Sequence, residues 1–299
     1  NFSIAEDVIT LAGIVSEIKK YGEVAVFHLL DRINLFEDRL AGMAFSWGDR
    51  NVFVKIGCGV SEEQFLELFG PIFSDKGIKI YGHDIKSLMV YLKKKGIDID
   101  GLAFDTMIGG YILDASRDTY LVSELTQDYL GYTFEPVSSL TGKGRNFTPF
   151  CEIPAETLAG AAVRHSRAIL ELTGAIKEKI EENGQHELLY DIELPLIEVL
   201  ADMEYRGFKV NSAELQNYSA RLDEKIKISE EDIYNLAGET FNINSPRQLG
   251  VILFEKLGLP VVKKTKTGYS TDAEVLEHLA PMHEIVSKIL EYRQLVKLK

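Results

Sequence analysis

Residues 23–56 read EVAVFHLLDRINLFEDRLAGMAFSWGDRNVFVKI, and this segment decides the fold that we expect for the first part of the chain. It contains three runs that are rich in β-branched and aromatic residues, at positions 23–29, 40–47 and 51–56. Such runs, bounded by short polar turns, are typical of β-strands. The segment therefore predicts three consecutive strands of one sheet.

The residues around this segment alternate between strand-like and helix-like patterns. Further strands are expected at 78–81 and near 102–104, and helices at 61–73, 84–95 and 106–113. Three strands in a row followed by strand–helix alternation favour a mixed sheet with helices on both faces. At the start of the chain, Ser3-Ile4-Ala5-Glu6 has the spacing of a capping box, which predicts a helix from there to about Tyr21.

The composition is that of a globular protein that can form sizeable cores. The chain has 299 residues, of which 45% are hydrophobic, and its mean hydropathy is -0.03. No apolar run approaches the roughly 18–20 residues that a membrane-spanning helix needs. No charged-then-apolar segment opens the chain, so we expect a cytoplasmic protein. Cys58 and Cys151 are far apart and in no metal-ligand spacing, which excludes a disulfide framework.

The net charge of -13 at first argues against nucleic-acid binding. The charge is uneven, however, because acidic and basic residues balance from about Met203 onward. Residues 256–271 lack acidic side chains but include Lys263, Lys264 and Lys266. A local basic stretch can bind phosphate on an acidic protein, so the net charge does not decide this question.

The second part of the chain is almost wholly helical by its hydrophobic period. A long helical pattern at about 154–182 is broken at residues 183–185, which gives an expected first domain of residues 1–178 and a second of residues 179–299. Further helices are expected at 189–205, 212–236, 246–257, 272–279 and 283–299, with a short strand-like run at 208–210. Because the last pattern has no cap and the chain starts at Asn1, we expect it to be cut from a longer protein.

Three blocks in the second part resemble the thumb subdomain of family A DNA polymerases, the family of bacterial DNA polymerase I. They are YRGFKV at 205–210, FNINSPRQL at 241–249 and KTKTGYST at 264–271. The terminal YRQL at 292–295 is similar to the helix that leads from this thumb toward the palm. The resemblance implies a polymerase fragment that is truncated before its palm and fingers.

Polar residues in these blocks are candidates for contact with a DNA backbone. Those at 242–248 surround an expected helix N-terminus, whose free N–H groups attract an anion. Those at 263–271 offer charge and hydroxyls to sugar-phosphate, and none reads a base edge. The candidate DNA-binding residues are Asn242, Asn244, Ser245, Arg247, Gln248, Lys263, Lys264, Lys266, Thr267, Ser270 and Thr271. Without the resemblance, a structural helix cap and a solvated loop would explain the same pattern.

The first part resembles the 3'→5' exonuclease domain of the same polymerases, most clearly at GLAFDTM, residues 101–107, and YIL, residues 111–113. The resemblance implies an α/β ribonuclease H-like domain, with a mixed sheet and helices on both faces, followed by a mainly α-helical thumb region.

The chain departs from this family at the metal ligands. Proofreading nucleases use about four carboxylates to hold two divalent cations that activate water and stabilise the phosphate. The positions that align with the catalytic residues are Phe27, Leu29, Leu88, Ala161 and His165. Hard divalent cations require oxygen ligands, which these side chains do not supply. We therefore expect an inactive exonuclease domain with no metal site.

The resemblance implies a role for each part in the parent protein. The inactive domain would serve as a scaffold packed against the polymerase module, and the thumb would grip a primer–template duplex without regard to sequence. No cofactor is expected in this fragment, since Mg²⁺ would bind in the missing palm. We expect a monomer in the bacterial cytoplasm, associated with the nucleoid, and no membrane contact.

Alternatives from other functional classes stay open at this point. One is a free-standing DNA-binding or scaffold protein derived from a polymerase. Another is a nuclease with an unfamiliar site, which would require an acidic cluster elsewhere in the cleft. A third, a helical interaction domain fused to an α/β domain, leaves the thumb-like blocks unexplained.

Overall fold

The computed structural model describes residues 2–34, 37–265 and 268–299. The chain forms two compact units, Asn1–Gly207 and Phe208–Lys299. Within the described residues, no helix combines the length and the apolar character that crossing a membrane requires.

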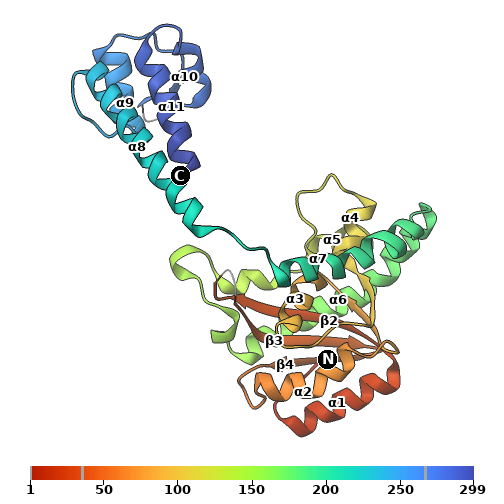
Figure 1. The fold of residues 1–299 in the computed structure, drawn as a ribbon. Coiled ribbons are helices and arrows are strands. Elements are labelled where there is room, and N and C mark those ends of the chain that lie inside the picture. The colour runs from red at the N-terminus through yellow and green to blue at the C-terminus, as the bar shows by residue number, and fades with distance from the viewer. Residues whose placement is uncertain (1, 35–36, 266–267) are drawn as a thin grey trace. The chain divides into compact units, whose positions relative to one another are not determined.

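The first unit is built on a six-stranded sheet (Figure 1). In spatial order its strands are β1 (Ser3–Ala5), β4 (Arg50–Lys55), β3 (Asp38–Trp47), β2 (Glu23–Arg32), β5 (Lys79–Gly82) and β6 (Leu102–Asp105). Strands β2, β3 and β4 form an antiparallel meander, while β1 runs parallel to β4, and β5 and β6 continue parallel to β2. The predicted mixed sheet is confirmed.

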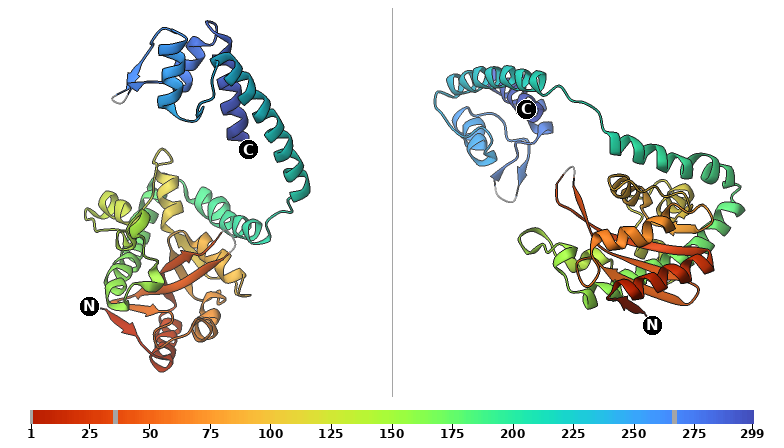
Figure 2. Two further views of the ribbon diagram at one scale, coloured as in Figure 1. Left: turned by 90° about the vertical axis from the view of Figure 1, so that its left-hand side faces the viewer. Right: turned by 60° about the horizontal axis from the view of Figure 1, so that its bottom comes forward.

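Helices cover the sheet because its central strands are apolar on both faces. On β4, Val52 and Val54 join the core formed with α1 (Val8–Tyr21) and α2 (Glu62–Phe73), whereas Phe53 packs with the first turns of α6 (Ala155–Glu182). Successive side chains of a strand point to opposite faces, so these cores lie on opposite sides of β4. Figure 2 gives two further views of these layers.

The remaining helices of this unit lie after β5. They are α3 (Ile85–Lys93), α4 (Thr106–Leu113), α5 (Val122–Leu130) and α7 (Leu194–Arg206), the last preceded by a π-helical turn at Leu188–Glu193. The interval between α5 and α6 contains only 3₁₀ turns, at Val137–Thr141, Gly144–Asn146 and Phe150–Glu152.

The capping-box prediction for residues 3–6 is wrong. Ser3, Ile4 and Ala5 form β1 and pair in register with residues 52–54 of β4. The helix starts at Val8 instead, because the side chain of Asp7 accepts a hydrogen bond from the Thr10 N–H at 2.7 Å. The Ser-x-x-Glu spacing satisfied a local rule, whereas the pairing with β4 is a non-local contact that overrides it.

The region between the predicted domains also differs from expectation. The predicted division at residues 178 and 179 falls within α6, and the compact units divide at Gly207 instead. The reason is that α7 packs on α3 and so stays with the first unit. The functional boundary at 178 stays a prediction. The predicted strand at 208–210 is wrong, since these residues form no strand and the Phe208 side chain is 89% exposed.

The second unit is mainly helical, as predicted. It contains α8 (Ser212–Ala237), α9 (Pro246–Gly250) continued by a π-helical turn (Val251–Lys256), the short strands β7 (Lys264–Thr265) and β8 (Gly268–Tyr269), α10 (Ala273–Leu279) and α11 (Glu284–Leu298). Asn211 caps α8 through the N–H of Glu214 at 3.2 Å, in agreement with the sequence. Helices α8 and α11 pack together around a core that includes Ile233, Leu253 and Ile289.

Candidate functional site

A cleft of about 630 Å³ opens in the first unit beside β2 and the residues that follow β5. Phe27, His28 and Leu29 line it from β2, and His83 and Asp84 from the start of α3. The cleft therefore includes two of the positions at which the exonuclease resemblance expects metal ligands.

The apolar residues at the expected ligand positions belong to the cores of the domain. Leu29 is 1% exposed and packs with Phe53 and the first half of α6, while Leu88, a residue of α3, is fully buried in the other core. Phe27 is half-buried and packs against both of these cores. Ala161 is also buried, in the same core as Leu29. These side chains act as packing groups.

His165 is held as a neutral structural side chain. It is 4% exposed, its Nδ1 lies 2.8 Å from the carbonyl of Ala161, and its Nε2 accepts a hydrogen bond from the Val137 N–H at 3.4 Å. Because Nε2 accepts, Nδ1 carries the proton and donates it to Ala161. Burial lowers the pKa of His165 to about 4. Both ring nitrogens are engaged within the protein.

Buried polar groups next to His83 serve the backbone around β5 and β6. The buried carboxylate of Asp105 accepts hydrogen bonds from the N–H groups of Ile85 and Met107, at 2.7 and 2.8 Å, and burial raises its pKa. The hydroxyl of Thr106 donates to a carbonyl of β5, so it accepts from Nδ1 of His83 at 2.9 Å. Burial lowers the pKa of His83 to about 4.

His28 differs from the other cleft histidines, because its buried Nδ1 has no hydrogen-bond partner in the described part of the chain. Burial lowers the pKa of His28, although the negative charge of Asp84 acts to raise it. Asp84 has φ of +51°, a left-handed conformation, and accepts a hydrogen bond from the Ser87 hydroxyl at 2.7 Å.

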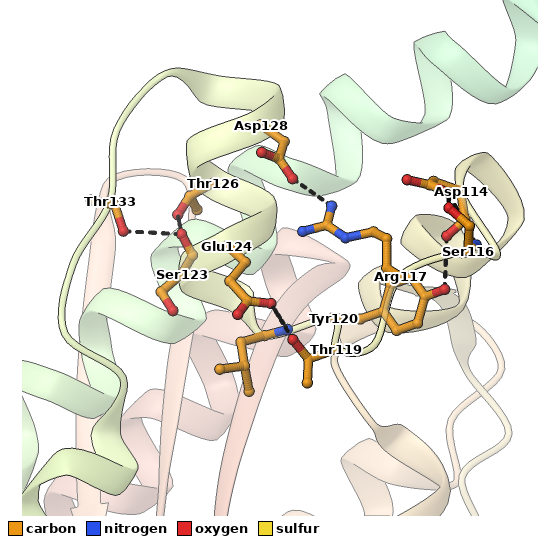
Figure 3. Close-up of polar contacts among 11 residues, drawn as sticks. Asp114, Ser116, Arg117, Thr119, Tyr120, Ser123, Glu124, Thr126, Asp128 and Thr133 are labelled. Atoms are coloured by element: carbon orange, nitrogen blue, oxygen red, sulfur yellow. Dashed lines mark hydrogen bonds and ion pairs between the residues drawn. The ribbon is translucent and has the colours of Figure 1, made fainter.

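One wall of the cleft is the loop between α4 and α5, and Figure 3 shows the polar contacts that hold it. Arg117 forms an ion pair with Asp128 on α5, and the hydroxyl of Thr119 donates to Glu124 at 2.8 Å. The same Glu124 accepts from the N–H of Leu121 at 3.3 Å and so caps α5. These bonds tie the loop to α5 and so order this wall of the cleft.

The donor set of the cleft does not fit a pair of divalent cations. None of the aligned positions carries a carboxylate, and Nδ1 and Nε2 of His165 are occupied. No three His, Cys, Asp or Glu side chains within residues 2–34, 37–265 and 268–299 are placed to hold a metal ion. We derive no hydrolytic step from this cleft, and its inactivity stays a prediction.

In the second unit, the predicted polar residues around 242–248 build a helix cap. Ser245 caps α9 through the Gln248 N–H at 3.4 Å, and the Gln248 side chain accepts from the Asn242 N–H at 2.8 Å. The amide of Asn244 donates to the hydroxyl of Tyr292 on α11 at 3.0 Å. These bonds fit the interpretation of residues 242–248 as a structural helix cap. Contact of these residues with DNA stays a prediction.

Asp272 organises the residues that follow the β7–β8 hairpin. Its carboxylate accepts from the Ser270 hydroxyl at 2.8 Å, caps α10 through the Val275 N–H at 3.0 Å and pairs with Lys263 at 3.2 Å. The bonds from Val275, Ser270 and Lys263 lower the pKa of Asp272. Ser270 is buried, which differs from the expectation that its hydroxyl faces a DNA backbone.

Thr271 is also engaged inside the unit. It is buried, and the guanidinium of Arg293 on α11 donates to its carbonyl at 2.5 Å and to its hydroxyl at 3.4 Å. Burial lowers the pKa of Arg293. Arg247, Ser270, Thr271 and Arg293 line one cleft of about 760 Å³.

The other predicted DNA contacts differ in their surroundings. Asn242, Asn244, Arg247, Gln248 and Lys264 are exposed, and Ser245 is half-buried. Lys266 and Thr267 lie outside the described residues.

Asp272 and Arg293 were not among the residues predicted from the sequence. The Asp-x-x-Val spacing at 272–275 is an N-cap signal that could have identified Asp272. Arg293 has no such signal, because its partner Thr271 lies 22 residues away in the chain.

Comparison with known proteins assigns both units. Residues 28–172 match the family model of the DNA polymerase I ribonuclease H-like domain, and residues 212–299 match that of DNA polymerase family A. The chain is 42% identical over 267 residues to DNA polymerase I of Geobacillus stearothermophilus, and 44% identical over 267 residues to that of Bacillus subtilis (strain 168). These alignments cover 87% and 89% of the chain, but 29% of either relative.

A solved structure shows the same fold. The POL domain of Pol1 from M. smegmatis, in complex with DNA primer-template and dNTP, matches 99% of the chain with a TM-score of 0.71 at 24% sequence identity. The chain covers 48% of that protein. The expected ribonuclease H-like domain and helical region are thereby confirmed as a fold.

Proposed function

Since the chain belongs to the DNA polymerase I family, within family A of the DNA polymerases, we propose that it acts as part of a DNA-directed DNA polymerase in replication and repair synthesis. In this proposal the second unit is the thumb, which holds a primer–template duplex through its backbone. Base edges are not read, so the grip is independent of sequence.

The exposed cations of the second unit are the observation that carries this proposal. Arg247 and Lys264 are exposed, and neither forms an ion pair with any described residue, whereas Lys263 pairs with Asp272. Cations without an internal partner release counterions when they meet phosphate, which is the main source of sequence-independent affinity for DNA. Arg247 also borders the cleft of about 760 Å³.

We further propose that the first unit is an inactive exonuclease domain retained as a scaffold. The burial of Leu29 and Leu88 in two cores supports this role, since these positions contribute to the stability of the domain. A buried apolar side chain in place of an ionised group avoids a large desolvation cost.

The outer face of α7 supports the scaffold role. The buried side of this helix packs Leu194, Ile197 and Ala201 into the core. Five apolar residues on or just before the helix are between 39% and 63% exposed, namely Ile192, Leu196, Val199, Leu200 and Met203. Their spacing places them on one side of the helix. An exposed apolar patch of this kind marks an interaction surface, which suits contact with the polymerase module.

The remaining elements of the proposal concern the parent protein. Mg²⁺ would bind in its palm, which is not among the residues of this chain. The polymerase would work as a monomer in the bacterial cytoplasm, at the nucleoid.

A labelled primer–template duplex tests both parts of the proposal. The 299-residue chain is mixed with it at low and moderate salt, with Mg²⁺ or Mn²⁺, and band position and primer length are read together. We expect a shift that weakens with salt and no shortening of the primer. Metal-dependent shortening from the 3' end would instead favour a nuclease with an unfamiliar site. A complete lack of binding at low salt would contradict the thumb assignment for this chain.

A further inference from the structure

Three lysines of the first unit line a cavity of about 590 Å³ at the amino-terminal end of β5. They are Lys76, Lys79 and Lys177. Lys79 is the first residue of β5, while His83 of the nuclease-like cleft follows its last residue. At about 3.3 Å per residue the strand separates the two sites by about 13 Å. The cavity is therefore distinct from the cleft.

Lys177 is the most constrained of the three. It projects from α6, and its Nζ lies 5.0 Å from the ring centroid of Tyr81 and 5.2 Å from that of Phe104. The Tyr81 hydroxyl donates to Glu23 at 2.7 Å, which fixes the ring beneath the ammonium group. Burial and the charge of Lys79 lower the pKa of Lys177, and Glu23 opposes this effect.

The charge of this lysine cluster is not neutralised by ion pairs. None of the three lysines forms an ion pair with another described residue, although nearby Lys93 pairs with Asp98 at 3.0 Å. Asp100 and Glu198 also line the cavity, and Glu23 lies opposite Lys79 on the neighbouring strand β2. Because no described carboxylate lies within ion-pair distance of the three lysines, their ammonium groups keep hydrogen-bond donors for an incoming anion.

The rest of the cavity wall is largely apolar. Tyr190, Leu194 and Pro195 contribute from the segment that leads into α7, and Met89 and Leu102 from α3 and β6. The volume lies within the roughly 300–1,000 Å³ of small-molecule sites, which combine apolar walls with a few polar groups.

We propose that this cavity binds the phosphate of a small organic phosphate of the nucleotide class. Lys79 and Lys177 hold the phosphate oxygens, and the wall around Tyr190 accommodates the organic part. The phosphate could come from a free nucleotide or from the end of a nucleic-acid strand. The proposal goes beyond the polymerase role, because all the residues that line the cavity belong to the first unit.

Isothermal titration calorimetry on the 299-residue chain at low salt tests it, with dATP and with a single-stranded oligothymidylate in separate arms. We expect Lys177→Gln and Lys79→Gln each to weaken binding about ten-fold, since a charge-assisted hydrogen bond contributes at least that factor. Lys177→Arg should retain most of the affinity. The matched control is Lys20→Gln on α1, an exposed lysine that should leave binding unchanged.

The two arms identify the source of the phosphate. Loss of dATP binding in the lysine variants supports a free nucleotide, and loss of oligonucleotide binding alone supports a strand end. Absence of binding in both arms overturns the proposal, as does an equal loss in Lys20→Gln, which would indicate unspecific attraction. Circular dichroism checks the fold of each variant. If Lys177→Gln unfolds, Lys79→Gln still tests the proposal, because Lys79 is exposed and its substitution should not disturb the fold. Arg247→Ala changes the second unit alone. It should weaken duplex binding and leave dATP binding unchanged, which separates the test of the cavity from the test of the proposed function.

Discussion

The ring of Phe27 stacks on the imidazole of His165, with centroids 4.3 Å apart and an angle of 20° between the planes. Phe134 meets the same imidazole edge-on at 4.9 Å. Both Phe27 and His165 stand where the exonuclease resemblance expects metal-binding carboxylates. An aromatic cluster thus occupies positions at which the resemblance implies metal ligands.

The neutral state of His165 predicts a loss of stability in mild acid. Its pKa is about 4 in the folded chain and about 6.5 when unfolded, so the unfolded chain binds the proton first as the pH falls. The contribution of neutral His165 to the free energy of unfolding is therefore present above pH 6.5 and is lost between pH 6.5 and pH 4. Urea unfolding should show a fall on the order of 2 kcal/mol from pH 7 to pH 5 through this residue. The stability of His165→Gln should fall less over the same pH range. An identical fall in the variant would contradict the conclusion that His165 is buried in its neutral form.

Leu88 tests whether the expected metal positions are now part of the core. Because it is fully buried, Leu88→Ala should lower the free energy of unfolding by about 2–5 kcal/mol. Leu88→Asp should cost more, since its carboxylate would be buried without a partner. Leu88→Met is the control, with an expected cost below about 1.5 kcal/mol. Urea unfolding gives these values. If Leu88→Asp proved as stable as Leu88→Met, the position would be accessible to water.

Arg247 and Ser270 should separate binding from stability in the second unit. Arg247→Ala should weaken duplex binding and reduce its salt slope by about 1, with little effect on unfolding, because the side chain is exposed. Ser270→Ala should remove the hydrogen bond to Asp272 and cost about 1 kcal/mol of stability, while the salt slope stays the same. Fluorescence anisotropy over a salt series and thermal melting measure the two effects. A changed slope in Ser270→Ala would place its hydroxyl at the DNA.

The two sides of α7 should respond differently to polar substitution. The double variant Val199→Gln, Met203→Gln should change the stability of this chain by no more than about 0.5 kcal/mol, since both residues are exposed. It should also bind less of a hydrophobic dye. Ile197→Gln, on the buried side, should be strongly destabilising. In a full-length polymerase the double variant should lower Tm, and an unchanged Tm there would contradict the scaffold surface.

Local patterns predicted much of the fold. The central strands follow runs of β-branched and aromatic residues, and the helix predicted from residue 61 starts with a capping box between Ser61 and Gln64. The helix at Thr106–Leu113 has the predicted bounds. Each of these depends on interactions within a few residues, which the sequence displays directly.

Contacts between distant residues account for what local patterns did not reveal. Residues 3–5 form a strand because β4 offers an edge about fifty residues later. The link between Thr271 and Arg293 on α11 is likewise not visible locally, and contact of Thr271 with DNA stays a prediction. At the nuclease-like cleft, the missing carboxylates were evident from the sequence, but the burial of His165 and its hydrogen bond from Val137 depend on the fold.

The single long helix α6 has a consequence for how the first unit unfolds. Its first half packs with Leu29 and Phe53, and its second half, through Ile169 and Leu172, packs with the core that holds α1 and α2. Neither core can lose its partner without releasing the helix that the other also uses. The two cores should therefore melt in one cooperative step, and a protease cut within α6 should unfold the whole unit rather than release half of it.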